Sequence, residues 1–455
     1  MIGAQNPFDL NADKTLFSES DYFKRLENSK NNNLYLFTLS TEFYLNTNLP
    51  NLENHNGLYL PKGSGGITGF LFYYGNKYLT LSAEPQIFIN KKFEIDVPEK
   101  KGVFGVLNDV PLKKNSNYHY NDIRNIGIKL KYQNHIIGYG NWNSWLGPGV
   151  HNSLTLSNNS KGFYHYFLET SGDLDLIKKI KYNLKYMVSD RMFNDFDNEY
   201  YLSILHFSLK HNLLEFGLNT SILSGGQDNI KWNQSDAINA VFNKQNAKYW
   251  DSFNVYYLLA DFEASKLKLF IEIGFLNTSY INFDKNIYND HAIGTNMGIR
   301  KYGAFGNSNT FFGIEYLRLA QGIYYDILPT PNWYDNVKYS YSSYLNRRWA
   351  AHSGSDSEDL LIFIGYKNSK VGFIYGLNYE RHGITYNFPP EVKFETRYSI
   401  HYSFKNINLY INYENELFEH YGFVDNNTNV WSQTYNEGSL QATKTLLFTL
   451  EHYIR

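Results

Sequence analysis

The stretch that begins at Arg347 holds the densest group of residues able to do chemistry. Asp356, Glu358 and Asp359 lie close together, preceded by His352 and by the run Arg347–Arg348–Trp349. Carboxylate oxygens at such spacing can bind Ca²⁺. They can also face a sugar, because aromatic faces stack on pyranose rings while Arg and Asp bind hydroxyls or uronate carboxylates. The third alternative is a solvated serine-rich loop that binds nothing.

Aromatic and charged side chains are interleaved over the region leading into this cluster. If a polysaccharide is bound, the contact residues should combine an aromatic face with polar or charged neighbours and should lie at the outer mouth of the fold. The residues that fit best are Trp333, Tyr334, Asp335, Tyr341, Tyr344, Arg347, Arg348 and Trp349. The alternative is that Trp333 and Trp349 only anchor the protein at a membrane interface.

The sequence carries no motif of a known catalytic or cofactor site. There is no G-x-S-x-G, no H-E-x-x-H and no phosphate-binding G-x-x-x-x-G-K-[ST] loop. The 13 histidines are dispersed, and His211, His291, His382 and His420 are expected to be solvated at strand ends or in loops. We predict a protein that is not an enzyme and has neither a metal nor another cofactor. A formal charge of −2 without a basic stripe argues against nucleic acid as a partner.

The elements that must position these residues repeat with a period of two. Apolar residues alternate with polar or small ones, which marks strands whose two faces meet different media. The predicted lipid-facing residues are Ile126, Ile128, Leu269, Ile271, Phe373 and Leu377, and the predicted inward residues are Lys129, Glu272 and Asn378.

Composition supports a membrane barrel over a helical membrane protein. Aromatic residues make up 18% of the chain, with 41 Tyr and 33 Phe, which suits strands with one wet face and aromatic belts at two interfaces. No run approaches the roughly 20 apolar residues of a transmembrane helix. The mean hydropathy of −0.46 is what alternating lipid and lumen faces produce. The absence of cysteine excludes a disulfide-stapled module and a thiolate metal site.

Strand-like segments number about 18, and short polar turns alternate with long polar connections, as in outer-membrane barrels. One of these segments is predicted near residue 176 and another near residue 336. Residues 1–33 differ, because Ser18 and Asp21 resemble a capping box before Tyr22, Phe23 and Leu26 at helical spacing. We therefore predict an all-β fold, a transmembrane antiparallel barrel over residues 34–455, with a short helix in a periplasmic segment over residues 1–33.

One aromatic-flanked corner stands out between residues 141 and 163. Two tryptophans lead into a proline held between two glycines, which indicates a sharp turn in which both glycines need positive φ. A short alternating segment and a polar cluster follow. The residues that define the motif are Trp142, Trp145, Gly147, Pro148, Gly149, Ser157, Asn158 and Asn159. We expect a structural role for this turn ahead of ligand contact.

These motifs together resemble the Wzi-type capsule-assembly proteins of bacterial outer membranes. W-x-x-G-P-G followed by N-S-L-x-L-S-N-N-x-x-G-F carries the resemblance, and the stretches 349–360 and 56–85 agree in order, so that it spans residues from about 50 to about 385. It implies a barrel whose lumen is occluded by loops and inward side chains. It also implies a lectin-like protein that holds capsular or other surface polysaccharide at the cell exterior.

Two other functions stay open at this point. The barrel could be a porin-like sugar channel, or a scaffold subunit within a larger outer-membrane assembly. The expected partners are surface polysaccharide, outer-membrane lipid and possible further outer-membrane proteins. The expected location is the bacterial outer membrane, which requires that a secretory signal preceded Met1 and was removed.

Overall fold

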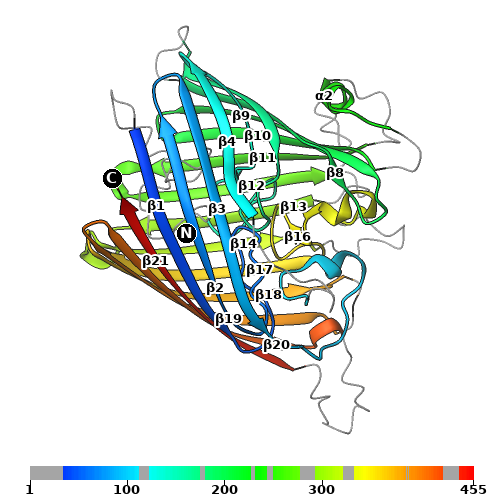
Figure 1. Ribbon diagram of the computed structural model, residues 1–455, viewed down its shortest axis with the longest axis vertical. Helices are drawn as coiled ribbons and strands as arrows, with labels where there is room; N and C mark the ends of the chain where they lie inside the picture. The colour runs from blue at the N-terminus through cyan, green and yellow to red at the C-terminus, as the bar shows by residue number, and fades with distance from the viewer. Residues whose placement is uncertain are drawn as a thin grey trace.

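The computed structural model of this chain is a closed antiparallel β-barrel of 18 strands (Figure 1). The structure describes residues 34–111, 122–174, 180–226, 231–242, 250–276, 293–320, 333–385, 387, 389–423 and 440–454. Each wall strand pairs with the next wall strand in sequence. The barrel closes where β1 (Leu34–Asn46) pairs with β21 (Gln441–Ile454).

The remaining wall strands are β2 (Gly63–Gly75), β3 (Leu79–Lys92), β4 (Asp122–Tyr132), β5 (His135–Gly140), β6 (His165–Asp173), β7 (Ile180–Ser189), β9 (Glu199–His211), β10 (Leu214–Gly225), β11 (Trp250–Phe262), β12 (Leu267–Leu276), β13 (Ile293–Tyr302), β14 (Thr310–Arg318), β17 (Ser357–Lys367), β18 (Val371–His382), β19 (Glu391–Phe404) and β20 (Ile407–Glu419). The minor elements are β8 (Met192–Phe193), β15 (Ser343–Tyr344), β16 (Arg347–Arg348), the helix α2 (Gln234–Phe242), and the 3₁₀ turns η2 (Gly102–Val106), η3 (Glu263–Ser265), η4 (Ala304–Gly306), η5 (Val337–Ser342) and η6 (Tyr421–Phe423).

The predicted inward and outward faces of the strands are confirmed. Lys129 and Glu272, predicted to point inward, are 2% and 0% exposed, whereas Ile128 and Leu269 on the outer face are 43% and 38% exposed. Asn378 is likewise buried and Phe373 exposed, while Ile126, Ile271 and Leu377 are half-buried. A strand exposes alternate residues to opposite faces, so one correct residue fixes the faces of its neighbours as far as the next irregularity, such as the register shift where β3 pairs with β4.

The two ends of the barrel differ in the length of their connections. At one end the strands are joined by short turns, and several of these place a residue in the left-handed region: Gln133, Asn212, Lys266 and Lys405, with φ between 50° and 52°. Both ends of the described chain lie at this short-turn end, where Phe37 pairs with Ile454. The long connections all lie at the opposite end, which confirms the predicted asymmetry.

One predicted strand is absent and one actual strand was missed. Residues near 336 form η5 at the end of the barrel with the long connections, because Ser340, Tyr341 and Ser342 have φ of 48°, 55° and 55°, which no strand accommodates. The tyrosines of this segment mimic a period of two. The missed strand is β6, whose start His-Tyr-Phe-Leu is apolar on both faces and so shows little alternation.

The predicted N-terminal helix lies outside the described residues. Among the helices that the structure describes, none is long and apolar enough to cross a membrane. The helix α2 packs against the outside of the wall, where Ala237 meets Val188 and Tyr201, and Val241 meets Ile222 (Figure 1).

Candidate functional site

Several long connections fold back into the barrel and fill it. We call this interior body the plug and define it as residues 47–62, 93–111, 141–164 and 333–356. Most of its side chains are buried, including polar ones, from Leu49 through Leu60 and from Asn141 through Ser160 with few exceptions. Chain from the barrel's own connections therefore occupies its interior at the long-loop end.

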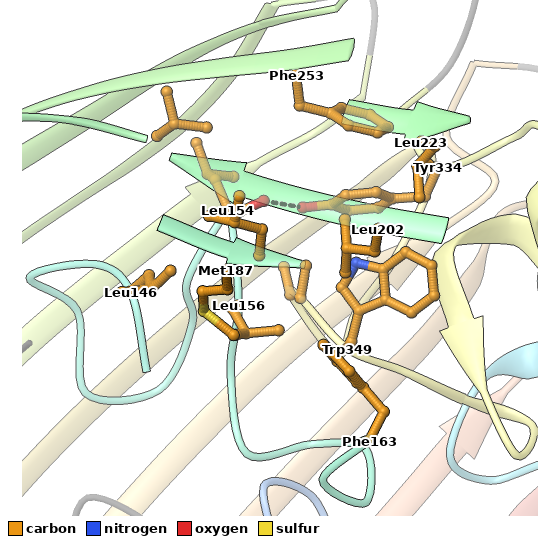
Figure 2. Packing of buried hydrophobic residues seen from close by; sticks show 14 of the residues in the cluster. Leu146, Leu154, Leu156, Phe163, Met187, Leu202, Leu223, Phe253, Tyr334 and Trp349 are labelled. Carbon is orange, nitrogen blue, oxygen red and sulfur yellow. Dashed lines mark hydrogen bonds between the residues drawn. The ribbon is translucent and has the colours of Figure 1, made fainter. Parts of the chain in front are cut away.

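One side of the plug is apolar and packs on the wall strands β6 to β14. Figure 2 shows Leu154, Leu156 and Trp349 of the plug gathered with side chains from the wall strands. The hydroxyl of Tyr334 donates a hydrogen bond of 2.7 Å to the carbonyl oxygen of Leu154, which joins two plug segments within this apolar cluster.

The family-like motif lies at the centre of the plug. Ser157 donates through its hydroxyl to the carbonyl of Ala350 at 2.6 Å. The amide of Asn159 donates to the carbonyl of Arg348 at 3.1 Å and its oxygen accepts from Asn108 at 2.7 Å. The backbone of Asn158 accepts from the N–H of Asn56 at 2.8 Å. All four plug segments are therefore held together through these few residues.

The tight turn of the motif is anchored to the wall. The carbonyl of Pro148 accepts from Arg300 at 3.0 Å, and the N–H groups of Val150 and Asn152 donate to the carboxylate of Glu315 at 2.8 and 2.6 Å. Trp142 and Trp145 are also buried, with the indole of Trp142 donating to Ser82 at 2.9 Å.

The expectation that Gly147 and Gly149 need positive φ is wrong. Neither lies in the left-handed region. Space is what requires glycine there, since a Cβ on Gly147 would lie 2.6 Å from Oε1 of Glu272, and one on Gly149 would lie 2.2 Å from the carbonyl of Asn152. The turn needs glycine because it is pressed against neighbouring atoms.

The residues predicted to contact polysaccharide divide into buried and accessible groups. Five of them are inside the plug: Trp333, Tyr334, Arg347, Arg348 and Trp349. The two arginines bind within the protein, where Arg347 lies over the ring of Tyr59 and Arg348 over that of Tyr334. They also donate to the carbonyls of Leu107 and Val103. Asp335 is exposed, and Tyr341 and Tyr344 are half-buried.

The accessible residues share the long-loop end with the connection between β7 and β9. Asn194 of that connection donates to the carbonyl of Lys338 at 2.9 Å, which holds it against η5. Partial burial and the nearby charges of Asp195 and Asp335 raise the pKa of Tyr341. We call the exposed or half-buried set at this point the mouth surface: Asp195, Phe196, Asp335, Tyr341, Tyr344 and Asn346. Sequence spacing could not reveal it, because its parts come from separate connections.

The other side of the plug is charged. Glu53 and His352 of the plug face Asp359, Glu380 and Lys393 of the wall, all buried. Nε2 of His352 lies 3.1 Å from both Glu53 and Asp359, and Lys393 contacts Glu53 and Glu380.

Burial and the neighbouring carboxylate of Glu380 raise the pKa of Glu53 to about 7. Burial alone would lower the pKa of His352, but Glu53, Asp359 and Glu380 raise it well above its ordinary value.

Two sequence interpretations fail on this side. His382 is buried rather than solvated, with its ring nitrogens 3.1 Å from Glu380 and 3.0 Å from Glu391. Of the acidic cluster, Asp356 and Asp359 are buried as well, and Asp356 accepts from the backbone N–H of Thr385. Glu358 pairs with Arg318 at 3.1 Å and also contacts Arg381. Asp356 and Asp359 are thus part of the internal structure, whereas Glu358 lies on the opposite face of β17 with two partly exposed arginines.

A closed barrel with an apolar outer face, short turns at one end and long loops at the other has the architecture of bacterial outer-membrane barrels. No protein-family model matches the chain, and no curated protein sequence does.

Among solved structures, the chain resembles Wzi of Escherichia coli, described as an outer-membrane, carbohydrate-binding β-barrel involved in group 1 capsule assembly. The TM-score is 0.59 at 9% identity, covering 90% of this chain and 83% of Wzi. OccAB3 of Acinetobacter baumannii matches with a TM-score of 0.49 at 10% identity, covering 92% of this chain and 99% of that one. OpdQ of Pseudomonas aeruginosa matches with 0.48 at 11%, covering 92% and 97%.

Proposed function

We propose that this protein is a non-enzymatic outer-membrane barrel that holds surface polysaccharide at its long-loop end. The observation that carries the proposal is the plug, whose buried segments occupy the space through which a channel would conduct. A barrel of this size leaves an aqueous lumen unless something fills it. A filled barrel that still presents an elaborate outer mouth is better suited to binding than to transport.

The outer face supports residence in a lipid bilayer. Leu446, Phe448 and Leu450 of β21 point outward and are 36–40% exposed in the absence of lipid. Near the long-loop end, Tyr139 lies against Tyr166 with ring centroids 4.3 Å apart, and its hydroxyl donates to Asp190. Tyrosines with an apolar body and a polar tip are typical of membrane interfaces.

The mouth surface offers the side chains that sugars require. Phe196 is 63% exposed and provides an aromatic face. Asp195, Asp335 and the hydroxyl of Tyr341 provide hydrogen-bonding groups for sugar hydroxyls. The description of Wzi as carbohydrate-binding adds support at the level of the fold.

Glycan binding by the purified protein in detergent tests the proposal. Phe196→Ala and Tyr341→Ala should each weaken binding at least tenfold while the barrel stays folded. The matched controls are Phe305→Ala and Tyr78→Ala, which remove exposed aromatic rings from turns at the opposite end, where the two side chains are 76% and 56% exposed. Equal losses in both pairs, or none in either, would place the binding surface elsewhere.

The porin-like alternative predicts a different measurement. A closed plug should give no steady single-channel conductance in planar bilayers, whereas a sugar channel should conduct and be blocked by its substrate. Conductance by the wild-type protein would overturn the closed-lumen part of the proposal. The scaffold alternative predicts copurification with other outer-membrane proteins and no glycan binding.

A further inference from the structure

Four buried side chains of the charged interface have the composition of a metal site. Glu53, His151, His352 and Glu380 each offer one ligand atom, and these atoms all lie within 4.8 Å of one another. Three of the residues come from three different plug segments, and Glu380 comes from β18. The sequence gives no hint of the cluster, because the two histidines stand far apart along the chain.

The spacing of these atoms fits a small tetrahedral cation. Nε2 of His352 lies 3.1 Å from Oε2 of Glu53 and 3.6 Å from Oε1 of Glu380, and Nε2 of His151 lies 3.8 Å from Oε2 of Glu53. Ligand bonds of about 2.0–2.1 Å place neighbouring ligands of tetrahedral Zn²⁺ about 3.3 Å apart. All four ligand atoms lie within 4.8 Å of one another, so they have to approach by up to about 1.5 Å to hold the ion.

An amide and a carboxylate hold the ring of His151 beside the cluster. Nε2 of His151 lies 3.1 Å from the side-chain nitrogen of Asn378 and 3.2 Å from Oδ2 of Asp359, and Asn378 also donates to Oδ1 of Asp359 at 2.6 Å. Neighbouring groups that fix the position of an imidazole are typical of metal sites.

Polar atoms at the centre of the cluster form ion pairs without well-formed hydrogen bonds. Nε2 of His352 lies 3.1 Å from Oε2 of Glu53, but within the described part of the chain neither of these buried atoms, nor Nδ1 of His352, makes a hydrogen bond of good geometry. Buried polar atoms usually make one, and those that do not point to a missing ion or water.

The side chains around the cluster carry more negative than fixed positive charge, which favours a bound cation. Five carboxylates meet here, those of Glu53, Asp359, Glu380, Glu395 and Glu414, while the permanent cations in contact with them are Lys393 and Arg397. Negative charge thus exceeds fixed positive charge among side chains that, apart from that of Arg397, are buried. Such an excess is costly unless a proton or a metal ion compensates it.

We propose that Glu53, His151, His352 and Glu380 bind one Zn²⁺ ion, with Asp359 beside the two imidazoles as a supporting carboxylate. Two imidazole nitrogens favour zinc over Ca²⁺ or Mg²⁺, which prefer oxygen ligands. The ion ties three plug segments to strand β18, so its role is to fasten the plug. The site is independent of polysaccharide binding at the mouth surface.

Metal content and thermal unfolding of the full-length protein in detergent test the proposal. After removal of metal with a chelator, added Zn²⁺ should bind at one equivalent and raise the unfolding temperature, whereas Ca²⁺ should do neither. Co²⁺ in the same site should give the intense visible absorption of a four-coordinate ion. Sub-stoichiometric Zn²⁺ binding with no thermal shift and no such absorption would show that protons and ion pairs alone hold the cluster.

Variants identify the ligands. His151→Gln and His352→Gln should each weaken Zn²⁺ binding by more than about tenfold, since even supporting residues around metal sites contribute that much. The matched control is His206→Gln. His206 is a buried histidine of β9 that does not belong to the cluster, and its ring lies 2.7 Å from the side-chain oxygen of Asn219. Equal zinc affinity in all three variants would overturn the assignment. If the first two fail to fold, the Co²⁺ spectrum of the wild-type protein still decides.

Discussion

The plug meets the wall through two interfaces of opposite chemistry. Towards the strands from β6 to β14 the contact is mainly apolar, apart from the hydrogen bonds between the tight turn and Arg300 and Glu315, and towards β17–β20 it is a network of buried acids and bases. An apolar contact depends on volume and tolerates exchange between side chains of similar size. A buried charged contact depends on each partner, because removing one leaves the other uncompensated.

Two buried lysines illustrate the contrast, since each is 1% exposed. Lys185 of β7 lies on the apolar side, 3.4 Å from the hydroxyl of Ser144 and over the ring of Phe167. Lys393 of β19 contacts Glu53 and Glu380 and lies 3.4 Å from Glu395. The same side chain thus contacts three carboxylates directly at one interface, whereas at the other its direct partners are a hydroxyl and a ring, and the carboxylate of Glu169 on the paired strand acts on it without direct contact.

The largest expected effect is that of Lys393→Met, which strands three buried carboxylates. We expect a loss of about 4 kcal/mol in the free energy of unfolding, measured by urea denaturation in lipid vesicles. The control is Lys185→Met, which removes a buried charge that makes no ion pair within the described residues and only a longer-range interaction with Glu169, so it should cost at most about 1 kcal/mol. Equal losses of unfolding free energy in the two variants would show that the charged and the apolar interface do not differ in their dependence on a buried lysine.

The apolar interface should respond to lost volume. Leu154→Ala removes a side chain that is 1% exposed in the middle of the cluster, and we expect a loss of about 3 kcal/mol from burial and cavity formation. Leu154→Met keeps most of the volume and should lose less than about 1.5 kcal/mol in the same assay. A larger loss for Met than for Ala would show that shape governs this contact more than volume.

Gly147 lies where the turn of the plug contacts the wall. A substitution at this position tests how closely the plug is packed against the wall. Gly147→Ala brings a Cβ to 2.6 Å from Glu272 and 2.8 Å from Ser153, so we expect a loss of about 2 kcal/mol and faster proteolysis of the plug. Gly376→Ala is the control, because its nearest neighbour would lie at 3.7 Å. Comparable behaviour of the two would mean that the turn can shift without cost.

The smallest effect should come from a polar bond within the apolar side. Tyr334→Phe keeps the ring but removes the hydroxyl that donates to Leu154, which should lower stability by about 1 kcal/mol. Tyr341→Phe removes a hydroxyl from the half-buried mouth surface and should change stability by less than about 0.5 kcal/mol. Thermal unfolding of both variants under identical conditions measures the difference.

The wall could be predicted from sequence because its rule is local. Alternation placed Lys129 and Glu272 inside and Ile128 and Leu269 outside, and all four lie there. The rule failed in two places. At the start of β6 the residues on both faces are aromatic or apolar, so no alternation is visible, and at η5 tyrosines two positions apart gave an alternation without a strand.

The plug could not be predicted in the same way. Its residues resemble solvated loop residues, such as Asp356 and Asn159, yet they are buried because distant segments supply their hydrogen bonds. Arg347 and Arg348 were chosen as sugar ligands for their chemistry, but whether an arginine faces solvent or an internal carbonyl depends on contacts that no local pattern records. For the same reason the convergence of His151 with His352 was not foreseen.

The pairing of Glu53 with Lys393 also sets an order of events during biogenesis. The two residues are separated by 340 positions, and the first plug segment follows β1 while its partner lies on β19. Glu53 of this segment therefore lacks Lys393 as a partner until nearly the whole chain has been inserted. Contacts between such distant positions form slowly. The interior is thus filled late, after the barrel has formed. If a strand near the C-terminal end paired in the wrong register, the contact between Glu53 and Lys393 could not form and the interior would stay open.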